Sequence, residues 1–288
     1  MATLSAELRY TQPHWLADAF DLLEQYGAGA SLLAGGTDLV VGLRKNRIAP
    51  RVLVDLKGIE DLPWGVEESA GRVRIGAITP LTDITAHPAI SGLFPALVEA
   101  ANTVGSVQIR NRATLAGNIC NASPAADTAP ALLAYRASVL VSGRERSRRV
   151  PVEEFMLGPG LTARQPSEIV TAIELPLPPP GTGSRFARLT RRRGVDLATV
   201  SVCAVVGPRV TRLAYGAVAP RPFVLVDDSG LLADPQAFPD DRRALISSFA
   251  ARASPISDLR GSQQYRQAML VPFTERALAS AITRRDGA

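Results

Sequence analysis

The sequence predicts an α+β protein made of two or three compact units. A chain of 288 residues can bury cores of that number, and a hydrophobic content of 46% is ordinary for a globular protein. Segments with helical periodicity and short apolar runs typical of strands follow one another along the chain. Prolines and glycines crowd the segment 175–183, which predicts a domain boundary because prolines stiffen the backbone and glycines permit turns.

The first predicted element is a helix at 13–26. Leu16, Phe20 and Leu23 follow Pro13 at helical spacing, and a glycine comes directly after the segment, where a helix is expected to end. These residues place one apolar face against a core.

Two short apolar runs, 31–34 and 52–54, are predicted to be buried strands. The first run leads into Gly35-Gly36, and Thr37 and Asp38 then offer N-cap chemistry for another helix. The sequence therefore predicts a strand, a glycine turn and a helix in immediate succession.

A second predicted unit precedes the proline-rich break. Its expected elements are strands at 72–75, 137–141 and 168–175 and helices at 80–86, 89–103 and 124–135. Between the last two helices lies a polar stretch, 105–121. A connection of that length is long for a compact domain, which favours a functional role over a plain loop.

The segment beyond the break is predicted to form an antiparallel sheet with helices. Three strand-like runs occupy 184–219, and alternation at 197–206 predicts a half-buried antiparallel hairpin. Two helices, near 240–250 and 261–285, are expected to end the chain.

The composition argues against several kinds of site. Cys120 and Cys203 are the only cysteines, which is too few for a disulfide framework or for an iron–sulfur cluster held by this chain alone. His14 and His87 are the only histidines, so a zinc site is not expected either. No apolar run is long enough for a transmembrane segment and no signal peptide is visible, so the expected location is cytoplasmic.

The net charge of +5 permits attraction to nucleic acid or to an acidic partner. The run 191–193 is more typical of a solvated face, and the cluster 144–149 of an exposed hairpin. Aromatic residues make up 5% of the chain and none lie within these clusters, so nothing there can stack on bases. No nucleic-acid partner is expected, although a non-enzymatic basic binding module remains an alternative.

Two polar constellations suit a phosphorylated or planar ligand. Paired glycines in 34–38 allow backbone N–H groups to approach a phosphate, and the pattern is neither a dinucleotide-binding motif nor a P-loop. Small and polar residues at 114–118 lie between the segments 109–112 and 123–127. Each constellation also has a plainer interpretation, a tight turn for the first and a polar connection for the second.

Taken together, these motifs resemble the FAD-binding medium subunit of the xanthine dehydrogenase and carbon monoxide dehydrogenase family of molybdenum hydroxylases. The segments that carry the resemblance, in family order, are 34–38, 109–119, 123–130, 186–198, 216–220 and 260–266. The resemblance implies two α/β FAD-binding subdomains of the vanillyl-alcohol-oxidase (PCMH) type and a C-terminal antiparallel sheet-and-helix domain. The expected bounds are 1–56 and 57–176 for the two subdomains and 184–286 for the C-terminal domain.

The resemblance also assigns cofactor-binding positions, and it implies no catalytic residue and no metal ligand in this chain. The positions are Leu33, Ala34, Gly35, Gly36, Thr37, Asp38, Leu39, Val104, Thr114, Ala116, Gly117, Asn118, Asp127, Val170 and Arg188. Two of them depart from the family pattern. Ala116 replaces a frequent glycine, so either its φ is negative or the loop shifts, and Arg188 replaces a frequent lysine, which keeps the charge and changes the hydrogen-bond geometry.

The function implied is electron transfer. FAD on this chain would take electrons from [2Fe-2S] clusters on an iron–sulfur small subunit and pass them to an external acceptor. A molybdopterin large subunit would hydroxylate the substrate, and the complex is expected to be a dimer of heterotrimers. A stand-alone FAD-dependent oxidoreductase remains an alternative, which the short chain disfavours.

Overall fold

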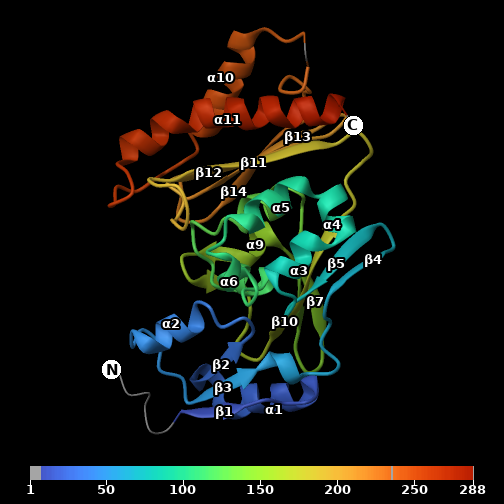
Figure 1. The fold of residues 1–288 in the computed structure, drawn as a ribbon, viewed down its shortest axis with the longest axis vertical. Helices are drawn as coiled ribbons and strands as arrows, with labels where there is room; N and C mark the ends of the chain where they lie inside the picture. The colour runs from blue at the N-terminus through green and yellow to red at the C-terminus, as the bar shows by residue number, and fades with distance from the viewer. Residues whose placement is uncertain (1–7, 235, 288) are drawn as a thin grey trace.

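The computed structural model describes residues 8–234 and 236–287, which form three larger sheets stacked along the long axis of the molecule and a fourth sheet of only two short strands, β8 (Met156–Gly158) and β9 (Leu161–Thr162) (Figure 1). The N-terminal sheet lies at one end, and the sheet built from the last strands lies at the other, beneath the C-terminal helix. A mixed sheet-and-helix body in the middle connects them.

The first sheet is parallel, with strand order β1-β3-β2. Its elements, in chain order, are β1 (Arg9–Thr11), α1 (Leu16–Tyr26), η1 (Gly27–Gly29), β2 (Ala30–Leu33), α2 (Leu39–Arg44), β3 (Val52–Asp55) and η2 (Leu56–Gly58). Helix α1 buries Ala19, Phe20 and Leu23 against the central strand β3, whose residues are all buried. The apolar spacing that predicted this helix therefore marks its core face.

The second sheet is antiparallel, with strand order β4-β5-β10-β6-β7. Its strands are β4 (Val66–Ser69), β5 (Arg72–Gly76), β6 (Ser138–Ser142), β7 (Ser147–Pro151) and β10 (Ile169–Pro176). The remaining elements are α3 (Leu81–Ala86), α4 (Pro88–Leu93), α5 (Pro95–Asn102), α6 (Val107–Arg110), α7 (Leu115–Cys120), α8 (Thr128–Ala134), α9 (Val152–Phe155), β8 (Met156–Gly158) and β9 (Leu161–Thr162). The helices and the sheet share one large hydrophobic core.

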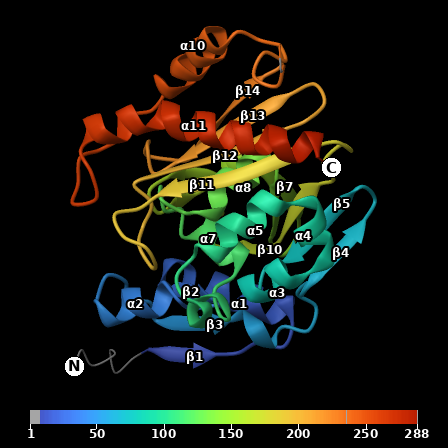
Figure 2. The ribbon, with the colours of Figure 1, turned by 45° about the horizontal axis from the view of Figure 1, so that its top comes forward.

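The third sheet is antiparallel and follows the chain order. Its elements are β11 (Gly183–Leu189), β12 (Val200–Val206), β13 (Thr211–Gly216), β14 (Phe223–Asp227), α10 (Pro239–Ala250) and α11 (Gln263–Asp286). Alternate residues of β12 face opposite cores: Val202 and Ala204 pack with the helices α10 and α11, whereas Cys203 and Val205 pack with the middle body. Figure 2 shows α11 across the outer face of this sheet.

This two-sided packing corrects the interpretation of 197–206. The segment is not a half-buried hairpin but leads into one strand, β12, in which every residue is buried. The alternation of side chains is real, but both faces of the sheet are covered, so neither face needed polar residues.

The segment 89–103 was predicted to be one helix, and this prediction was wrong. It forms two helices, α4 and α5, that meet at Phe94. Pro95 disfavours helical backbone in the residue before it, and Phe94 has φ −131° and ψ 53°. The polar stretch 105–121 was expected to be a connection, yet it contains α6 and α7.

Five edge or short strands, β1, β4, β8, β9 and β14, were not predicted. The predicted helices near the C-terminus and the exposed hairpin around 144–149 are present as α10, α11 and the β6–β7 turn. Of the two cysteines, Cys203 is buried and Cys120 is half-buried, and both are free thiols.

The expected bounds of the three units stay predictions. The core of the first sheet includes Ile169 from β10, so the first two units share apolar packing. Among the residues that the structure describes, no helix is both long and apolar enough to cross a membrane.

Candidate functional site

The first glycine turn lies between β2 and α2. Strand β2 ends at Leu33 and α2 begins at Leu39. Gly36 has φ +74°, in the left-handed region that side chains disfavour, and a Cβ there would lie 2.8 Å from the Leu33 side chain. The turn therefore needs glycine at this position for its shape.

The helix that follows the turn is not capped as the sequence suggested. Asp38 occupies the N-cap position of α2, but its backbone is helical (φ −94°, ψ −41°) and its side chain makes no capping hydrogen bond to the described residues. An N-cap side chain reaches the N–H groups of the first turn from an extended backbone, which Asp38 does not have. The prediction of a side-chain cap at Asp38 was wrong, and Thr37 lies half-buried beside it.

The two predicted loops touch each other at Gly35. A Cβ on this residue would lie 2.0 Å from the carbonyl oxygen of Arg112 and 2.9 Å from the Cα of Ala113. Because those are backbone atoms in a packed region, they cannot shift to make room for a side chain without a large cost in stability. Gly35 is thus required by the close approach of the two loops to each other.

A clamp of three side chains, Tyr10, Asp55 and Lys57, is hydrogen-bonded to the first turn. Lys57 donates from Nζ to the carbonyl oxygen of Ala34 (3.1 Å) and to Oδ1 of Asp55 (2.5 Å), and the Tyr10 hydroxyl donates to Oδ2 of Asp55 (2.6 Å). Burial alone would raise the pKa of Asp55, but the hydrogen bonds from Lys57 and Tyr10 outweigh it and lower that pKa. Sequence reasoning missed this clamp, although Lys57 is one of only two lysines in the chain.

The second loop contains a capped helix. Thr114 is the N-cap of α7, and its Oγ1 accepts a hydrogen bond from the backbone N–H of Gly117 (3.0 Å). Asn118 accepts from the Thr128 hydroxyl at Oδ1 (2.6 Å), which ties α7 to α8. Ala116 has a helical backbone and its side chain is in the main core, so the first of the two expected possibilities holds: its φ is negative.

Asp127 and Arg188 form a buried ion pair between the middle body and the third sheet. Arg188 donates from Nη1 to Oδ2 of Asp127 (2.7 Å) and to the carbonyl oxygen of Asp196 (3.2 Å). Burial raises the pKa of Asp127 to about 6, and the positive charge of Arg188 limits that rise. The substitution of arginine for lysine thus keeps the pair and lets one side chain reach two acceptors.

One oxygen of this pair lacks a partner. Oδ1 of Asp127 is buried and accepts no hydrogen bond within the described part of the chain. A buried carboxylate oxygen left without a donor is costly, so the site suits a ligand that brings a hydroxyl or N–H group. FAD carries several such donors, and it fits this site chemically.

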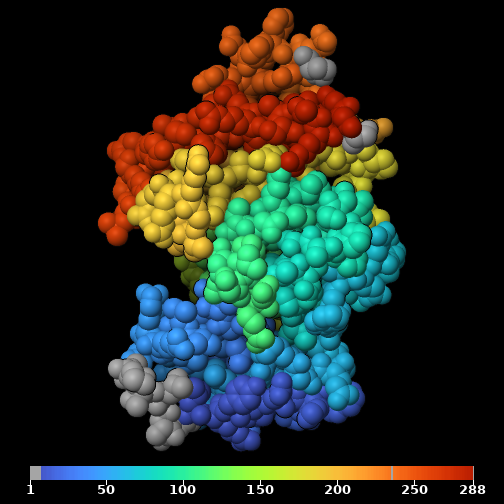
Figure 3. All heavy atoms as spheres, in the orientation of Figure 1, coloured from blue at the N-terminus to red at the C-terminus, as the bar shows by residue number. Residues whose placement is uncertain are grey.

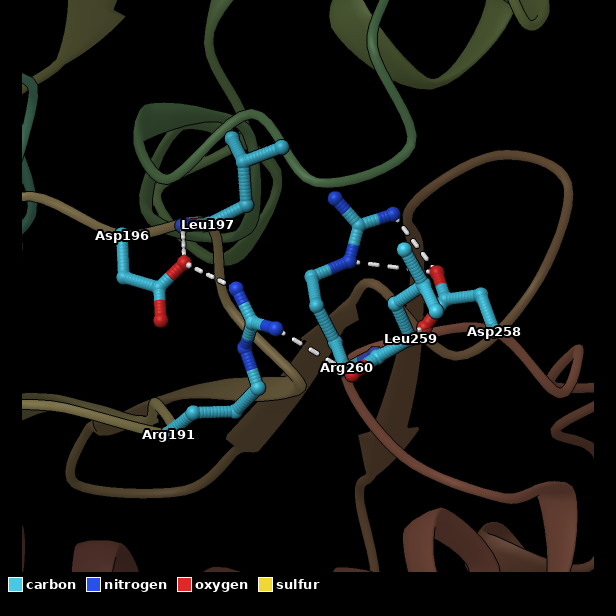
Figure 4. A pocket seen from close by; sticks show the side chains of 6 residues that line it. All are labelled: Arg191, Asp196, Leu197, Asp258, Leu259 and Arg260. Atoms are coloured by element: carbon cyan, nitrogen blue, oxygen red, sulfur yellow. Dashed lines mark hydrogen bonds and ion pairs between the residues drawn. The ribbon is translucent and has the colours of Figure 1, made fainter.

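A cavity of about 300 Å³ adjoins the ion pair through Asp196, which lines it (Figure 4). Arg191 crosses one wall of the cavity and donates to Oδ1 of Asp196 (3.3 Å) and to the carbonyl oxygen of Leu259 (3.2 Å). The run 191–193 therefore has local partners in addition to solvent. The segment 258–260, which forms the other wall, was noticed in the sequence only as part of the family resemblance.

The wall at 258–260 is fixed to the C-terminal helix by Arg266, which is buried. Its guanidinium donates to Asp258 (2.6 Å) and to the carbonyl oxygens of Thr199 (2.8 Å) and Ala217 (2.9 Å). Burial raises the pKa of Asp258, but hydrogen bonds from Arg260 and Arg266 prevail and lower it to about 2. The carboxylate is therefore charged at neutral pH and holds this wall in place.

The surface of the molecule is hollowed beside these elements. Figure 3 shows a hollow between the light-blue segment of α2, the green segment near residues 105–120 and the gold segment above them. Of the remaining predicted positions, Val104 is half-buried against the main core and Val170 is buried in β10. Their part in cofactor binding stays a prediction.

Comparison with known proteins identifies the family. Residues 6–178 match the FAD binding domain in molybdopterin dehydrogenase, and residues 185–281 match the CO dehydrogenase flavoprotein C-terminal domain. The carbon monoxide dehydrogenase medium chain of Hydrogenophaga pseudoflava is 32% identical over 96% of this chain and 97% of its own. A putative xanthine dehydrogenase FAD-binding subunit of Escherichia coli is 30% identical over 96% of this chain and 97% of its own.

A solved structure agrees with these sequence matches. In carbon monoxide dehydrogenase of Hydrogenophaga pseudoflava, a chain that is 31% identical superposes with a TM-score of 0.89 and covers 98% of this chain and 99% of its own. The α+β class with an FAD-binding region and a C-terminal sheet domain is confirmed. The chain belongs to the FAD-binding medium subunits of the molybdenum hydroxylase family.

Proposed function

We propose that this chain is the electron-transferring subunit of a molybdenum hydroxylase complex. It would take electrons from [2Fe-2S] clusters of a partner small subunit and pass them to an external acceptor such as NAD⁺, a quinone or dioxygen. When bound, FAD supplies the redox chemistry, and the protein binds it, orients it and limits the access of water.

The observation that carries the FAD-binding part of the proposal is the unsatisfied Oδ1 of Asp127, whose neighbour Thr128 is hydrogen-bonded to Asn118 of the second loop. Arg188 favours the ionised form of Asp127, which can then accept a hydrogen bond from a ligand hydroxyl. The glycine turn exposes backbone N–H groups without side chains, which suits a phosphate. Lys57 places a positive charge directly beneath that turn.

The cofactor-binding set therefore centres on Gly35, Gly36, Thr114, Asp127 and Arg188, with Lys57 added. The cavity next to Asp196 adjoins the Asp127–Arg188 pair, so a cofactor held by that pair would border it. The loop 191–197 would then limit the access of solvent to the cofactor.

The proposed partners are an iron–sulfur small subunit and a molybdopterin large subunit, assembled as a dimer of heterotrimers in the cytoplasm. Relatives named as the medium chain of carbon monoxide dehydrogenase and the medium subunit of nicotine 6-hydroxylase support membership of a multi-subunit complex. The chain itself would contribute neither the substrate pocket nor the molybdenum site.

The test is to co-express the chain with candidate small and large subunits and to record absorption spectra during anaerobic addition of substrate. Flavin and iron–sulfur bands that co-purify, with flavin bleaching only after the clusters are reduced, would support the proposal. A chain that purifies alone with bound flavin and oxidises a small substrate by itself would instead indicate a stand-alone flavoprotein. A colourless chain that binds nucleic acid at physiological salt would indicate a basic binding module.

A further inference from the structure

A second and larger cavity, of about 450 Å³, lies on the seam between the middle body and the third sheet. Its walls come from the end of α8, the proline-rich segment and the β12–β13 turn. The lining residues are Ala134, Tyr135, Arg136, Pro176, Leu177, Pro178, Pro179, Thr182, Val205, Gly207, Pro208, Arg209, Val210 and Arg212. None of the predicted flavin positions is among them, and the volume is typical of a small-molecule site.

The lining combines an apolar body with three guanidinium groups. Prolines and aliphatic side chains dominate the walls, while Arg136, Arg209 and Arg212 supply the charge. In residues 8–234 and 236–287 none of these three side chains makes an ion pair or a hydrogen bond to protein, in contrast to many other arginines of the chain. The carboxylate that acts on them, Glu153, lies near Arg212 without reaching ion-pair distance.

The charges at this site repel each other. Partial burial lowers the pKa of Arg212, the nearby charge of Arg136 lowers it further, and Glu153 counteracts only in part. Arg136 is exposed and Arg212 is half-buried, so water screens part of this repulsion and a bound anion would relieve the rest. The arrangement thus favours a bound anion.

The backbone at Arg136 adds a second observation. This residue follows Tyr135, the C-cap of α8, and has φ +59°, a left-handed conformation that follows many helices and that glycine adopts most easily. An arginine there reduces stability relative to glycine. A side chain kept at the expense of stability at the edge of a cavity is typical of a binding function.

We propose that this cavity binds a small organic anion, a carboxylate or a phosphate monoester with an apolar body, between the middle body and the third sheet. The guanidinium groups of Arg136 and Arg212 would hold the anionic end, and the proline-rich wall would cover the apolar part. Arg209, on the exposed turn, would neutralise the remaining charge. Occupation would link the two units across their seam and stabilise them together.

The test measures binding to the full chain by titration calorimetry and by the shift in Tm. The probes are benzoate, phenyl phosphate, benzyl alcohol and inorganic phosphate. We expect one of the two organic anions to bind at least about tenfold more tightly than benzyl alcohol and inorganic phosphate, which corresponds to one charge-assisted interaction. The tighter of the two identifies the preferred anionic group.

Variants separate binding from structure. Arg212→Gln should weaken binding at least about tenfold, and Arg209→Gln, in the exposed turn, should do so by a smaller factor without risk to folding. Arg136→Gly should weaken binding while raising the Tm of the ligand-free chain, because glycine fits the backbone and removes a repelling charge. Arg252→Gln, an exposed arginine outside the cavity, is the matched control and should bind as the unmodified chain does.

Equal affinities for benzoate, phenyl phosphate and benzyl alcohol would overturn the proposal, since they would show that the arginines play no part. Unchanged anion binding in both Arg212→Gln and Arg136→Gly would overturn it as well. A lower Tm of ligand-free Arg136→Gly would assign Arg136 a structural role instead. The proposal is independent of flavin binding, so its failure would leave the proposed function untouched.

Discussion

The two seams between the three sheets are built in different ways. At the first, the close approach is between backbones: Gly35 lies against the carbonyl of Arg112, and Lys57 fixes the turn from below. At the second, side chains interlock, because β12 contributes to two cores and the hydroxyl groups of Tyr135 and Ser184 hydrogen-bond across the seam (2.5 Å). The comparison teaches that the first seam depends on backbones that approach too closely for a side chain, whereas the second seam depends on buried side chains that also include a polar pair and line a cavity.

The largest expected loss of stability is in the apolar core of the middle body, beside the second seam. Phe94→Ala removes a fully buried ring and should lower the free energy of unfolding by about 3–5 kcal/mol. Chemical denaturation at saturating FAD measures it. Because Phe94 is not at the flavin site, the folded fraction should keep its flavin. If the folded fraction lost its flavin, the contrast between the seams would be broken.

The next effect is at the first seam. Gly35→Ala places a methyl group against the Arg112 carbonyl and should force the loops apart, at a cost of about 1–3 kcal/mol. The ratio of bound flavin to protein should fall strongly. Gly92→Ala, in helix α4 with open space around it, is the matched control and should keep both flavin and stability. Full flavin content in Gly35→Ala would contradict the placement of the cofactor.

The pKa of Asp127, raised to about 6, predicts a pH dependence that sharpens the comparison. A ligand donor prefers the ionised carboxylate, so the affinity for FAD should fall by about tenfold per pH unit below pH 6. Asp127→Asn should bind more weakly at pH 7 and lose this dependence. Dissociation constants between pH 5 and 8 provide the measurement, and identical profiles for both proteins would exclude the role of Asp127.

The same group has the opposite effect on the ligand-free chain. A carboxyl group whose pKa is higher in the folded than in the unfolded state stabilises the fold fully below the unfolded pKa of about 3.9, and that contribution is lost as the pH rises through about 6. Asp127→Asn should therefore gain stability relative to the unmodified chain between pH 4 and 7. Denaturation of the two ligand-free proteins at pH 4 and at pH 7 measures this change in relative stability.

The smallest expected loss of stability comes from the clamp formed by Lys57, Asp55 and Tyr10. Lys57→Met removes the hydrogen bonds to Ala34 and Asp55 and should lower stability by about 1 kcal/mol, because the lysine is partly solvated. The free energy of flavin binding should fall by more than the free energy of unfolding, because Lys57 no longer holds the glycine turn through the carbonyl oxygen of Ala34. Lys45→Met, the other lysine, is the control. Equal effects of the two substitutions on flavin affinity would exclude a specific role for the clamp.

Local patterns in the sequence predicted what depends on neighbours along the chain. The helix face at Leu16, Phe20 and Leu23 and the turn at Gly35 and Gly36 each follow from spacing or from backbone freedom within a few residues. Their identity as parts of one site came from the family resemblance.

The remaining features depend on contacts between distant segments. Strand β4 is largely exposed at a sheet edge and shows little apolar alternation, and β12 is buried on both faces because two separate groups of helices cover it. The Lys57–Asp55 clamp and the unsatisfied oxygen of Asp127 arise only once the sheets are in place. Tertiary packing determines all of these.

The most direct test of the account is a structure of the chain with bound FAD, within its complex. We predict density for the cofactor between the turn at Gly35–Gly36 and the N-terminus of α7, with a donor of the cofactor within hydrogen-bond distance of Oδ1 of Asp127. Cofactor density elsewhere, or a flavin that leaves Asp127 without a donor, would contradict the account.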